Sequence, residues 1–166
     1  MKPPSSYKDI QKLTRCLAAL SQFISKSGER NLPVFKNLRK LLSRPKEGDE
    51  LQLYLAVAKG AISSVRVREM EGVQKPIYYV NHVLHGSEEN YLIIDKFAFA
   101  LVVSACRLKP YFESHPITVV TDQPLKRILT NPALSGRMTT WAVKLSDFIH
   151  HKHWPILSSS VQPASR

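Results

Sequence analysis

Residues 51–70 alternate between apolar and other side chains, the pattern of β-strands that bury one face. One face of the first strand holds Leu51, Leu53, Leu55 and Val57. A turn at Lys59-Gly60 leads into a second strand, where Val65 and Val67 continue an apolar face. The other face of the first strand holds only Gln52, Tyr54, Ala56 and Ala58. The absence of charge on that strand raises the question of what its second face does.

Further strands and helices follow in a regular order. A turn at Glu71-Gly72 precedes a third β-rich run, KPIYYVNHVL at 75–84. Ser87 is placed to cap a long helix over 88–109, which Pro110 ends. The remaining segments predict a strand at 116–122, a short helix at 122–129 and a last helix at 135–149, with Trp141 and Phe148 on its core side. The order βββαβα predicts an α/β fold, a mixed sheet with helices packed on it.

The ends of the chain have a different character from this central part. Apolar positions at helical spacing from Ile10 to Ile24 predict an N-terminal helix that Ser6 caps. Residues 1–40 are too few to hold a core and predict a helical appendage. The main domain is expected at 48–150. Residues 151–166 are rich in serine and proline, which predicts a disordered tail.

Composition favours a folded intracellular protein. Of the 166 residues 43% are hydrophobic, enough to bury a core. Cys16 and Cys106 lie in apolar helical patterns, so we expect them to be small buried hydrophobes in a reduced compartment. The N-terminus has no apolar signal segment and no run has membrane-spanning length. The expected location is cytoplasmic or nuclear, with no membrane partner.

The net charge of +11 favours a polyanionic partner, and it is spread along the chain, with +6 in residues 1–50 and +5 in residues 51–166. Such a field attracts nucleic acid or an anionic surface without specificity. The candidates for contacts with a phosphate backbone are Lys109, Lys126, Arg127 and Arg137. Solubilising surface charge accounts for them equally well.

Asp122 is the candidate metal ligand. It ends the apolar strand in TVVTDQPL, and ligand groups gather at the carboxyl ends of strands in open α/β sheets. The alternative is that its carboxylate caps the helix that follows, and position alone favours the cap. The run HHKH at 150–153 is a weaker candidate, because no cysteine or acid accompanies it.

The segment from LYLAVAKG (53–60) through TDQPLKRIL (121–129), with SGRMTTWAVKLSDF (135–148), strongly resembles the RNase H-like domain behind reverse transcriptase in plant gypsy-type retrotransposon polyproteins. Residues 9–40 are similar to the end of the polymerase, its thumb and connecting region. The resemblance implies an RNA-directed DNA polymerase polyprotein whose RNase H-like part cuts the RNA strand of an RNA–DNA hybrid. That reaction uses two Mg²⁺ ions held by several carboxylates.

The acids that this chemistry requires are mostly missing. The first family acid position falls on Ala56, in LAVA at 55–58, and the second falls on Phe97, in DKFA at 95–98. Asp95 lies two residues away, about 200° around a helix, and cannot substitute. The third acid is present as Asp122, and no acid follows residue 149 to supply the fourth. We therefore expect a catalytically degenerate domain that does not bind Mg²⁺ productively.

Three functions remain open from the sequence. The leading hypothesis is a non-catalytic spacer or weak hybrid-binding module, as in plant lineages that carry a second RNase H domain. The alternatives are an active Mg²⁺-dependent hybrid nuclease and a gene relic without a selected role. The adjacent aspartates of the polymerase are absent from the chain, and a family segment is missing at Lys40-Leu41, so no polymerisation is expected.

Overall fold

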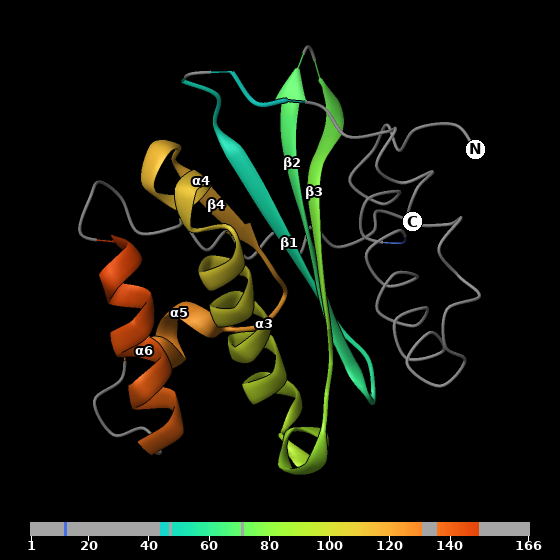
Figure 1. Ribbon diagram of the computed structural model, residues 1–166, viewed down its shortest axis with the longest axis vertical. Coiled ribbons are helices and arrows are strands. Elements are labelled where there is room, and N and C mark those ends of the chain that lie inside the picture. The colour runs from blue at the N-terminus through green and yellow to red at the C-terminus, as the bar shows by residue number, and fades with distance from the viewer. Residues whose placement is uncertain (1–11, 13–43, 47, 71, 131–135, 150–166) are drawn as a thin grey trace, which may run out of the picture.

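The computed structural model describes residues 12, 44–46, 48–70, 72–130 and 136–149. Four strands form one mixed sheet in the order β3-β2-β1-β4 (Figure 1). The strands are β1 (Leu51–Val57), β2 (Ala61–Met70), β3 (Val73–Val83) and β4 (Ile117–Val120). The first three are antiparallel neighbours, and β4 runs parallel to β1. The predicted mixed sheet is confirmed.

The helical elements after β3 in the described part are η2 (Gly86–Asn90), α3 (Ile93–Arg107), α4 (Lys109–Ser114), α5 (Leu125–Leu129) and α6 (Gly136–Ile149). The labelled helices α3 to α6 lie on one face of this sheet (Figure 1). The long helix α3 packs against β1, β2 and β3, and α6 packs against α3. The last helix was predicted at 135–149 and begins one residue later.

The prediction of a single helix from Ser87 is wrong. The 3₁₀ turn η2 comes first, with His85 as its cap residue, and the Glu88 carboxylate accepts a hydrogen bond from the His85 backbone N–H at 3.1 Å. Tyr91 and Leu92 then have extended ψ angles of 143° and 155°, which interrupt the helix. Pro110 lies in the first turn of α4, where its missing N–H leaves no helical bond unmade.

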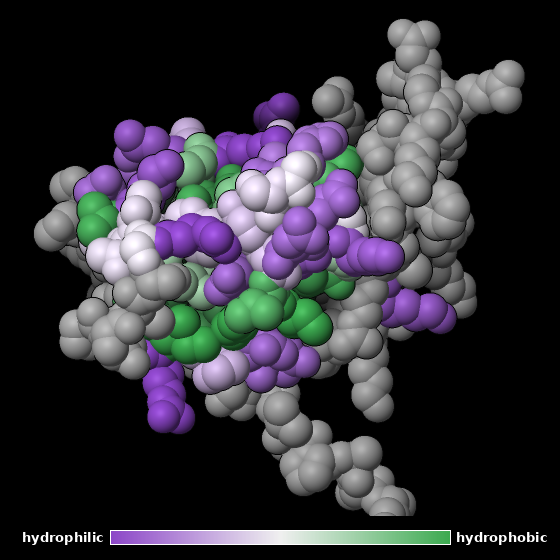
Figure 2. Space-filling view, turned by 90° about the horizontal axis from the view of Figure 1, so that it is seen from below, coloured by the Kyte–Doolittle hydropathy of each residue, from purple (hydrophilic) through white to green (hydrophobic). Residues whose placement is uncertain are grey.

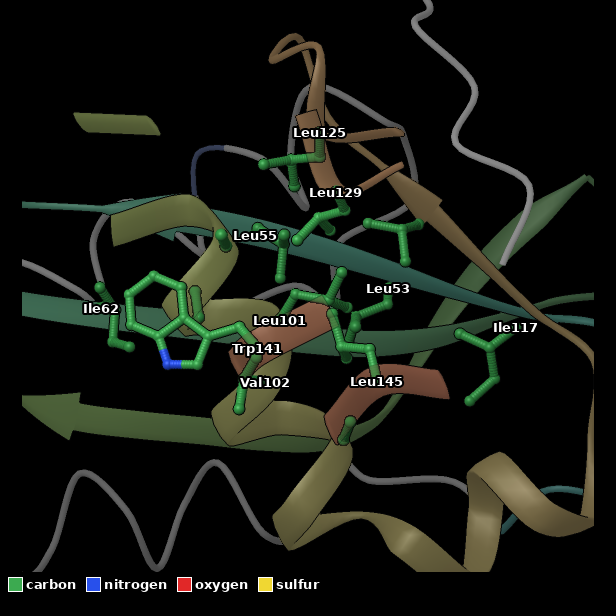
Figure 3. Close-up of a cluster of buried hydrophobic side chains, with 14 of the residues drawn as sticks. Leu53, Leu55, Ile62, Leu101, Val102, Ile117, Leu125, Leu129, Trp141 and Leu145 are labelled. Atoms are coloured by element: carbon green, nitrogen blue, oxygen red, sulfur yellow. The ribbon is translucent and has the colours of Figure 1, made fainter. Parts of the chain in front are cut away.

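The main core lies between the helices and the sheet. Its sheet side comes from Leu51, Leu53 and Leu55, and its helix side includes Leu101, Trp141 and Leu145 (Figure 3). Trp141 is buried and Phe148 is partly buried against this cluster, as predicted. Trp141 also stacks on Phe99 at a centroid distance of 5.4 Å, which joins α6 to α3.

The second face of β1 is buried as well. Tyr54 forms a smaller cluster with Val65, Val67 and Val120, from the neighbouring strands β2 and β4. Because β1 lies between two strands and has both faces buried, a charged side chain on it would be costly to desolvate. This position explains the uncharged pattern of β1 without reference to any reaction.

Several smaller expectations can be compared with the structure. The turn at Lys59-Gly60 is confirmed, since the Ala58 N–H donates to the Ala61 carbonyl at 2.8 Å. The burial predicted for Cys106 is wrong, because its side chain is exposed on α3 next to the buried Ala105. Cys16, the appendage at 1–40, the His-rich run at 150–153 and the tail at 151–166 fall outside the described residues.

The surface seen from below shows apolar side chains gathered among hydrophilic ones (Figure 2). The most exposed large apolar side chains of the described part are Leu92 at 70%, Ile93 at 66% and Val143 at 59%. The first two lie where α3 begins. Among the described helices, none is both long enough and apolar enough to cross a membrane.

Candidate functional site

The parallel pairing of β1 with β4 sets the geometry of the candidate site. Tyr54 of β1 lies opposite Val120 of β4. Ala56 lies two residues beyond this pair near the carboxyl end of β1, and Asp122 lies two residues beyond it in the bend that follows β4. Two of the positions singled out in the sequence therefore lie at the carboxyl ends of adjacent parallel strands.

Asp122 is exposed and does not cap a helix. The cap residue of α5 is Pro124, and no side chain hydrogen-bonds that helix end. The Asp122 carboxylate instead accepts a hydrogen bond from the Gln123 side-chain amide at 3.2 Å. The Gln123 backbone N–H donates to the Thr121 hydroxyl at 3.1 Å, which tightens the bend around Asp122. The interpretation of Asp122 as a helix cap is wrong.

The two substituted acid positions are both packed. Ala56 is 4% exposed and lies opposite Ser63 of β2, on the same sheet face as Tyr54. Phe97 is partly buried and packs against the main core cluster on the helix side of the sheet. The alternation along β1 thus turns Ala56 away from the face on which α3 lies. No group of three or more potential metal-ligating His, Cys, Asp or Glu residues occurs within the described ranges.

The polar residues beside Phe97 hold the fold together. Asp95 of α3 accepts a hydrogen bond from the Arg137 guanidinium of α6 at 3.3 Å. Lys96 is buried, and its Nζ donates to the Lys59 backbone carbonyl at 2.8 Å, so α3 is attached to the β1–β2 turn. Both side chains therefore join α3 to other elements of the fold.

The four candidate cations fall into two pairs. Arg137 binds Asp95 and also covers the Tyr91 ring at 4.1 Å, and Lys109 lies 3.7 Å from Glu113. Lys126 and Arg127 of α5 are exposed, and neither forms an ion pair with any acid of the described part. The structure thus separates two engaged cations from two that are open to a ligand.

A hollow of about 430 Å³ lies beside the two open cations. Residues on either side of Asp122 contribute to it, and its lining comprises Thr121, Gln123, Pro124, Leu125, Lys126, Arg127 and Thr130. Its volume falls within the range of about 300–1,000 Å³ that is usual for ligand pockets. Leu125 and Leu129 are buried, which anchors α5 and leaves Lys126 and Arg127 facing outward.

The opposite end of the sheet has a second hollow, of about 460 Å³, which is lined by Glu50, Gln52, Glu69, Gly72 and Thr118. Gln52 donates from its side-chain amide to the Glu69 carboxylate at 3.4 Å and accepts from the Tyr54 hydroxyl at 2.9 Å. Two acids therefore line this hollow, whereas two cations line the hollow beside α5.

Sequence reasoning missed the buried guanidinium of Arg66. This residue of β2 is 0% exposed, and its three guanidinium nitrogens have no hydrogen-bond partner among the residues that the structure describes. It lies 4.4 Å over the Tyr111 ring and 5.4 Å from the Phe112 ring centre, both in α4. Burial lowers the pKa of Arg66 to about 10. In the sequence, Arg66 alternates with Val65 and Val67 and carries no sign of burial, which follows from the packing of α4 over its guanidinium.

Two other residues have shifted pKa values with identifiable causes. Burial raises the pKa of Tyr79 to about 12. The pKa of Asp49 is lowered, first because its carboxylate accepts the Lys46 backbone N–H at 2.7 Å, and further because Arg68 lies at 3.2 Å. Both residues lie away from the Asp122 bend, so their shifted pKa values affect the stability of the fold and not the candidate site.

Comparison with known proteins identifies the family. Residues 46–148 match the family described as the RNase H-like domain found in reverse transcriptase. The chain is also 31% identical over 90 residues to the retrovirus-related Pol polyprotein from transposon opus of Drosophila melanogaster. That match covers 53% of this chain and 9% of the polyprotein, so the chain corresponds to a small part of it.

Solved structures of foamy viral protease–reverse transcriptase share the fold. The dRH form in complex with double-stranded DNA has a TM-score of 0.56 at 17% identity, covering 89% of this chain and 31% of that one. A complex with an RNA/DNA hybrid has a TM-score of 0.51 at 18% identity, covering 88% and 24%. At such identities the likeness shows the fold alone. Because the family match spans more than half of its residues, the chain belongs to the RNase H-like domains found in reverse transcriptase.

Proposed function

We propose that this chain is a catalytically degenerate RNase H-like domain that acts as a spacer or weak nucleic-acid-binding module. The observation that carries the proposal is the loss of carboxylates, because only Asp122 remains at the four family acid positions. The apolar residues at the other matched positions, Ala56 and Phe97, are packed into the fold. Packed substitutions of this kind are expected where a site has been filled and not merely damaged.

The residues present do not fit a pair of Mg²⁺ ions. Mg²⁺ takes oxygen ligands in nearly octahedral geometry and is usually held by at least one or two carboxylates besides substrate phosphates. Asp122 alone offers one exposed carboxylate, which leaves nothing to position a second ion. Removing a single charge-stabilising group from an active site costs about 10²–10³ in rate. Loss of the metal pair removes more than one such group.

The proposed partner is an RNA–DNA hybrid or other nucleic acid, contacted through its phosphate backbone. The net charge of +11 and the two open cations of α5 support this partner. The foamy viral structures of similar fold are complexes with DNA and with an RNA/DNA hybrid. We further propose an origin in a plant gypsy-type LTR retrotransposon, supported by the resemblance of its motifs, and a cytoplasmic or nuclear location.

A hydrolysis assay on the full chain tests the proposal. A labelled RNA–DNA hybrid is incubated with the protein in Mg²⁺ or Mn²⁺, beside the Asp122→Asn variant. We expect no cleavage above the level of that variant. Cleavage by the unaltered chain that Asp122→Asn abolishes would overturn the proposal and establish the active hybrid nuclease instead.

A melting experiment separates the spacer from the gene relic. A domain retained as a spacer must fold, so we expect one cooperative unfolding transition by circular dichroism. Absence of that transition would favour the relic. Hybrid binding without cleavage, weakening steeply with added salt, would support the binding module over a passive spacer.

A further inference from the structure

We propose that the carboxyl end of β4 binds the phosphodiester backbone of nucleic acid through Lys126 and Arg127, without a bridging divalent cation. This inference rests on the proposed function and names the site and the ionic requirement of its nucleic-acid contact. In a two-metal nuclease the metal ions join clustered carboxylates to the phosphate. In this chain the balance is reversed, because cationic side chains outnumber carboxylates beside the carboxyl end of β4.

The reversal follows from the described side chains. Asp122 is the single acid at the bend, and its carboxylate is partly occupied by the Gln123 amide at 3.2 Å. Lys126 and Arg127 follow within five residues, exposed and without an acid partner among the described residues. The summed charge of Asp122, Lys126 and Arg127 is therefore positive, so a phosphate can approach this region without a metal ion between them.

The shape of the region suits an extended backbone. Both cations line the hollow of about 430 Å³, which also contains the polar side chains of Thr121 and Gln123. Hydroxyl and amide groups of this kind bind phosphate oxygens and sugars, and such contacts position a nucleic acid without reading its sequence. The guanidinium of Arg127 offers a planar fork for two phosphate oxygens, and Lys126 adds a point charge.

The other candidate surfaces are less favourable for a phosphate. The lining of the hollow at the other end of the sheet includes two acids, Glu50 and Glu69, and no cation. Arg137 and Lys109, the other candidate contacts, are held by Asp95 and Glu113. Among the four candidate cations, Lys126 and Arg127 combine exposure, an adjoining hollow and freedom from an ion pair.

The test measures binding of a fluorescent RNA–DNA hybrid by the full chain, by anisotropy, at several salt concentrations in EDTA and in Mg²⁺. The site variant is Lys126→Ala/Arg127→Ala. The matched control is Lys75→Ala/Lys144→Ala, which removes the same net charge from β3 and α6. All variants are compared by thermal melting, so that a folding defect is recognised.

We expect equal affinity in EDTA and in Mg²⁺. A plot of log affinity against log salt concentration has a negative slope, and the site variant should reduce its steepness by about two. Between 50 and 200 mM salt, the wild type should therefore lose roughly tenfold more affinity than the variant does. The control should retain the wild-type slope. Asp122→Asn should bind at least as tightly as wild type, because it removes a negative charge beside the phosphate.

Three results would overturn the inference. They are binding that EDTA and Asp122→Asn both abolish, equal loss of slope in the site and control variants, and absence of binding. In each case the proposed function survives as a non-catalytic domain or spacer, provided that no cleavage occurs. Asp122-dependent cleavage would instead refute the proposed function itself, so the two failures are distinguishable.

Discussion

The Arg137 guanidinium of α6 lies 3.3 Å from the Asp95 carboxylate of α3 and also covers the Tyr91 ring at 4.1 Å. This contact joins two helices beside Phe97, the position of a family acid. It also removes Arg137 from the set of cations that are open to a phosphate. A residue predicted to bind nucleic acid thus has a structural partner.

Arg137→Ala tests that structural role. We expect the free energy of unfolding to fall by roughly 1 kcal/mol, since a partly exposed ion pair and a cation–π contact each contribute up to about that amount. Urea unfolding measures the loss, and high salt should reduce the difference. Hybrid affinity should fall no further than in Lys144→Ala, which removes an exposed cation of the same helix. A larger fall in affinity would restore Arg137 as a backbone contact.

Arg66→Leu should stabilise the protein. Its buried guanidinium has no hydrogen-bond partner in the described part of the chain, and replacing buried ion pairs by well-packed apolar side chains often stabilises proteins, by about 1–4 kcal/mol. The matched control is Arg68→Leu, on the same strand, which breaks the ion pair with Asp49 and should bring no gain. Denaturant unfolding of both variants at pH 7 measures the difference. A less stable Arg66→Leu would mean that stacking on Tyr111 outweighs the desolvation cost.

Arg66 and Tyr79 should have opposite effects on stability between about pH 10 and 12. The folded-state pKa of Arg66 is lowered, so its buried charge destabilises the folded state fully below about pH 10. This destabilisation decreases as the pH rises above that value and Arg66 loses its proton. The folded-state pKa of Tyr79 is raised to about 12, so the unfolded state ionises first and stability falls with rising pH. Relative to wild type, Arg66→Leu should lose stability more steeply there, and Tyr79→Phe less steeply. Parallel curves in urea unfolding would contradict both assignments.

Ser104→Ala should cost more than Ser64→Ala. The Ser104 hydroxyl donates to the Ala100 carbonyl at 2.6 Å and lies 2.6 Å from the Ser64 hydroxyl, which then donates to it. Removing Ser104 leaves a buried hydroxyl without its acceptor, at about 1–3 kcal/mol. The double variant should cost less than the sum of the single ones. Additive losses in a double-mutant cycle would show that the two hydroxyls do not interact.

Ala56→Asp should not restore a nuclease. Phe97 remains apolar, so Mg²⁺ still lacks a set of carboxylates, and no hybrid cleavage is expected. The 4% exposed position makes an unpaired carboxylate costly, and we expect a loss of about 3–5 kcal/mol at pH 7. Burial raises a carboxyl pKa, so the loss should be smaller near pH 4, where the group is neutral. Ala56→Asn, similar in size but uncharged, is the control, and an equal loss at both pH values would contradict the charge argument.

Much of the fold could be predicted from local patterns. The period-two alternation of residues 51–70 located β1, β2 and their turn, because successive side chains of a strand point to opposite faces of the sheet. The alternation did not show that the second face is buried as well. The prediction failed at Ser87 and at Cys106. A serine before an apolar run resembles a cap, and the angles at Tyr91 and Leu92 that break the helix depend on packing.

The candidate site divides in the same way. The sequence alone shows that Ala56 and Phe97 stand at positions that the resemblance matches to family acids, and that Asp122 keeps a carboxylate at a third. The separation of four cations into engaged and open pairs was not readable, since Arg137 and Asp95 are 42 residues apart in sequence. A contact of that kind exists only once α3 and α6 have packed together.

The sequence by itself determined which residues stand at the positions that the resemblance matches to family acids, because folding rearranges the side chains of a chain and cannot add to them. It also indicated the fold class through the order of the strands and helices. Tertiary structure decided what the uncharged strand means. β1 lies between β2 and β4 with both faces buried, so the cost of desolvation disfavours an unpaired charge along most of its length. At Ala56, near the carboxyl end of this strand, the absence of charge also bears on the proposed loss of the nuclease reaction.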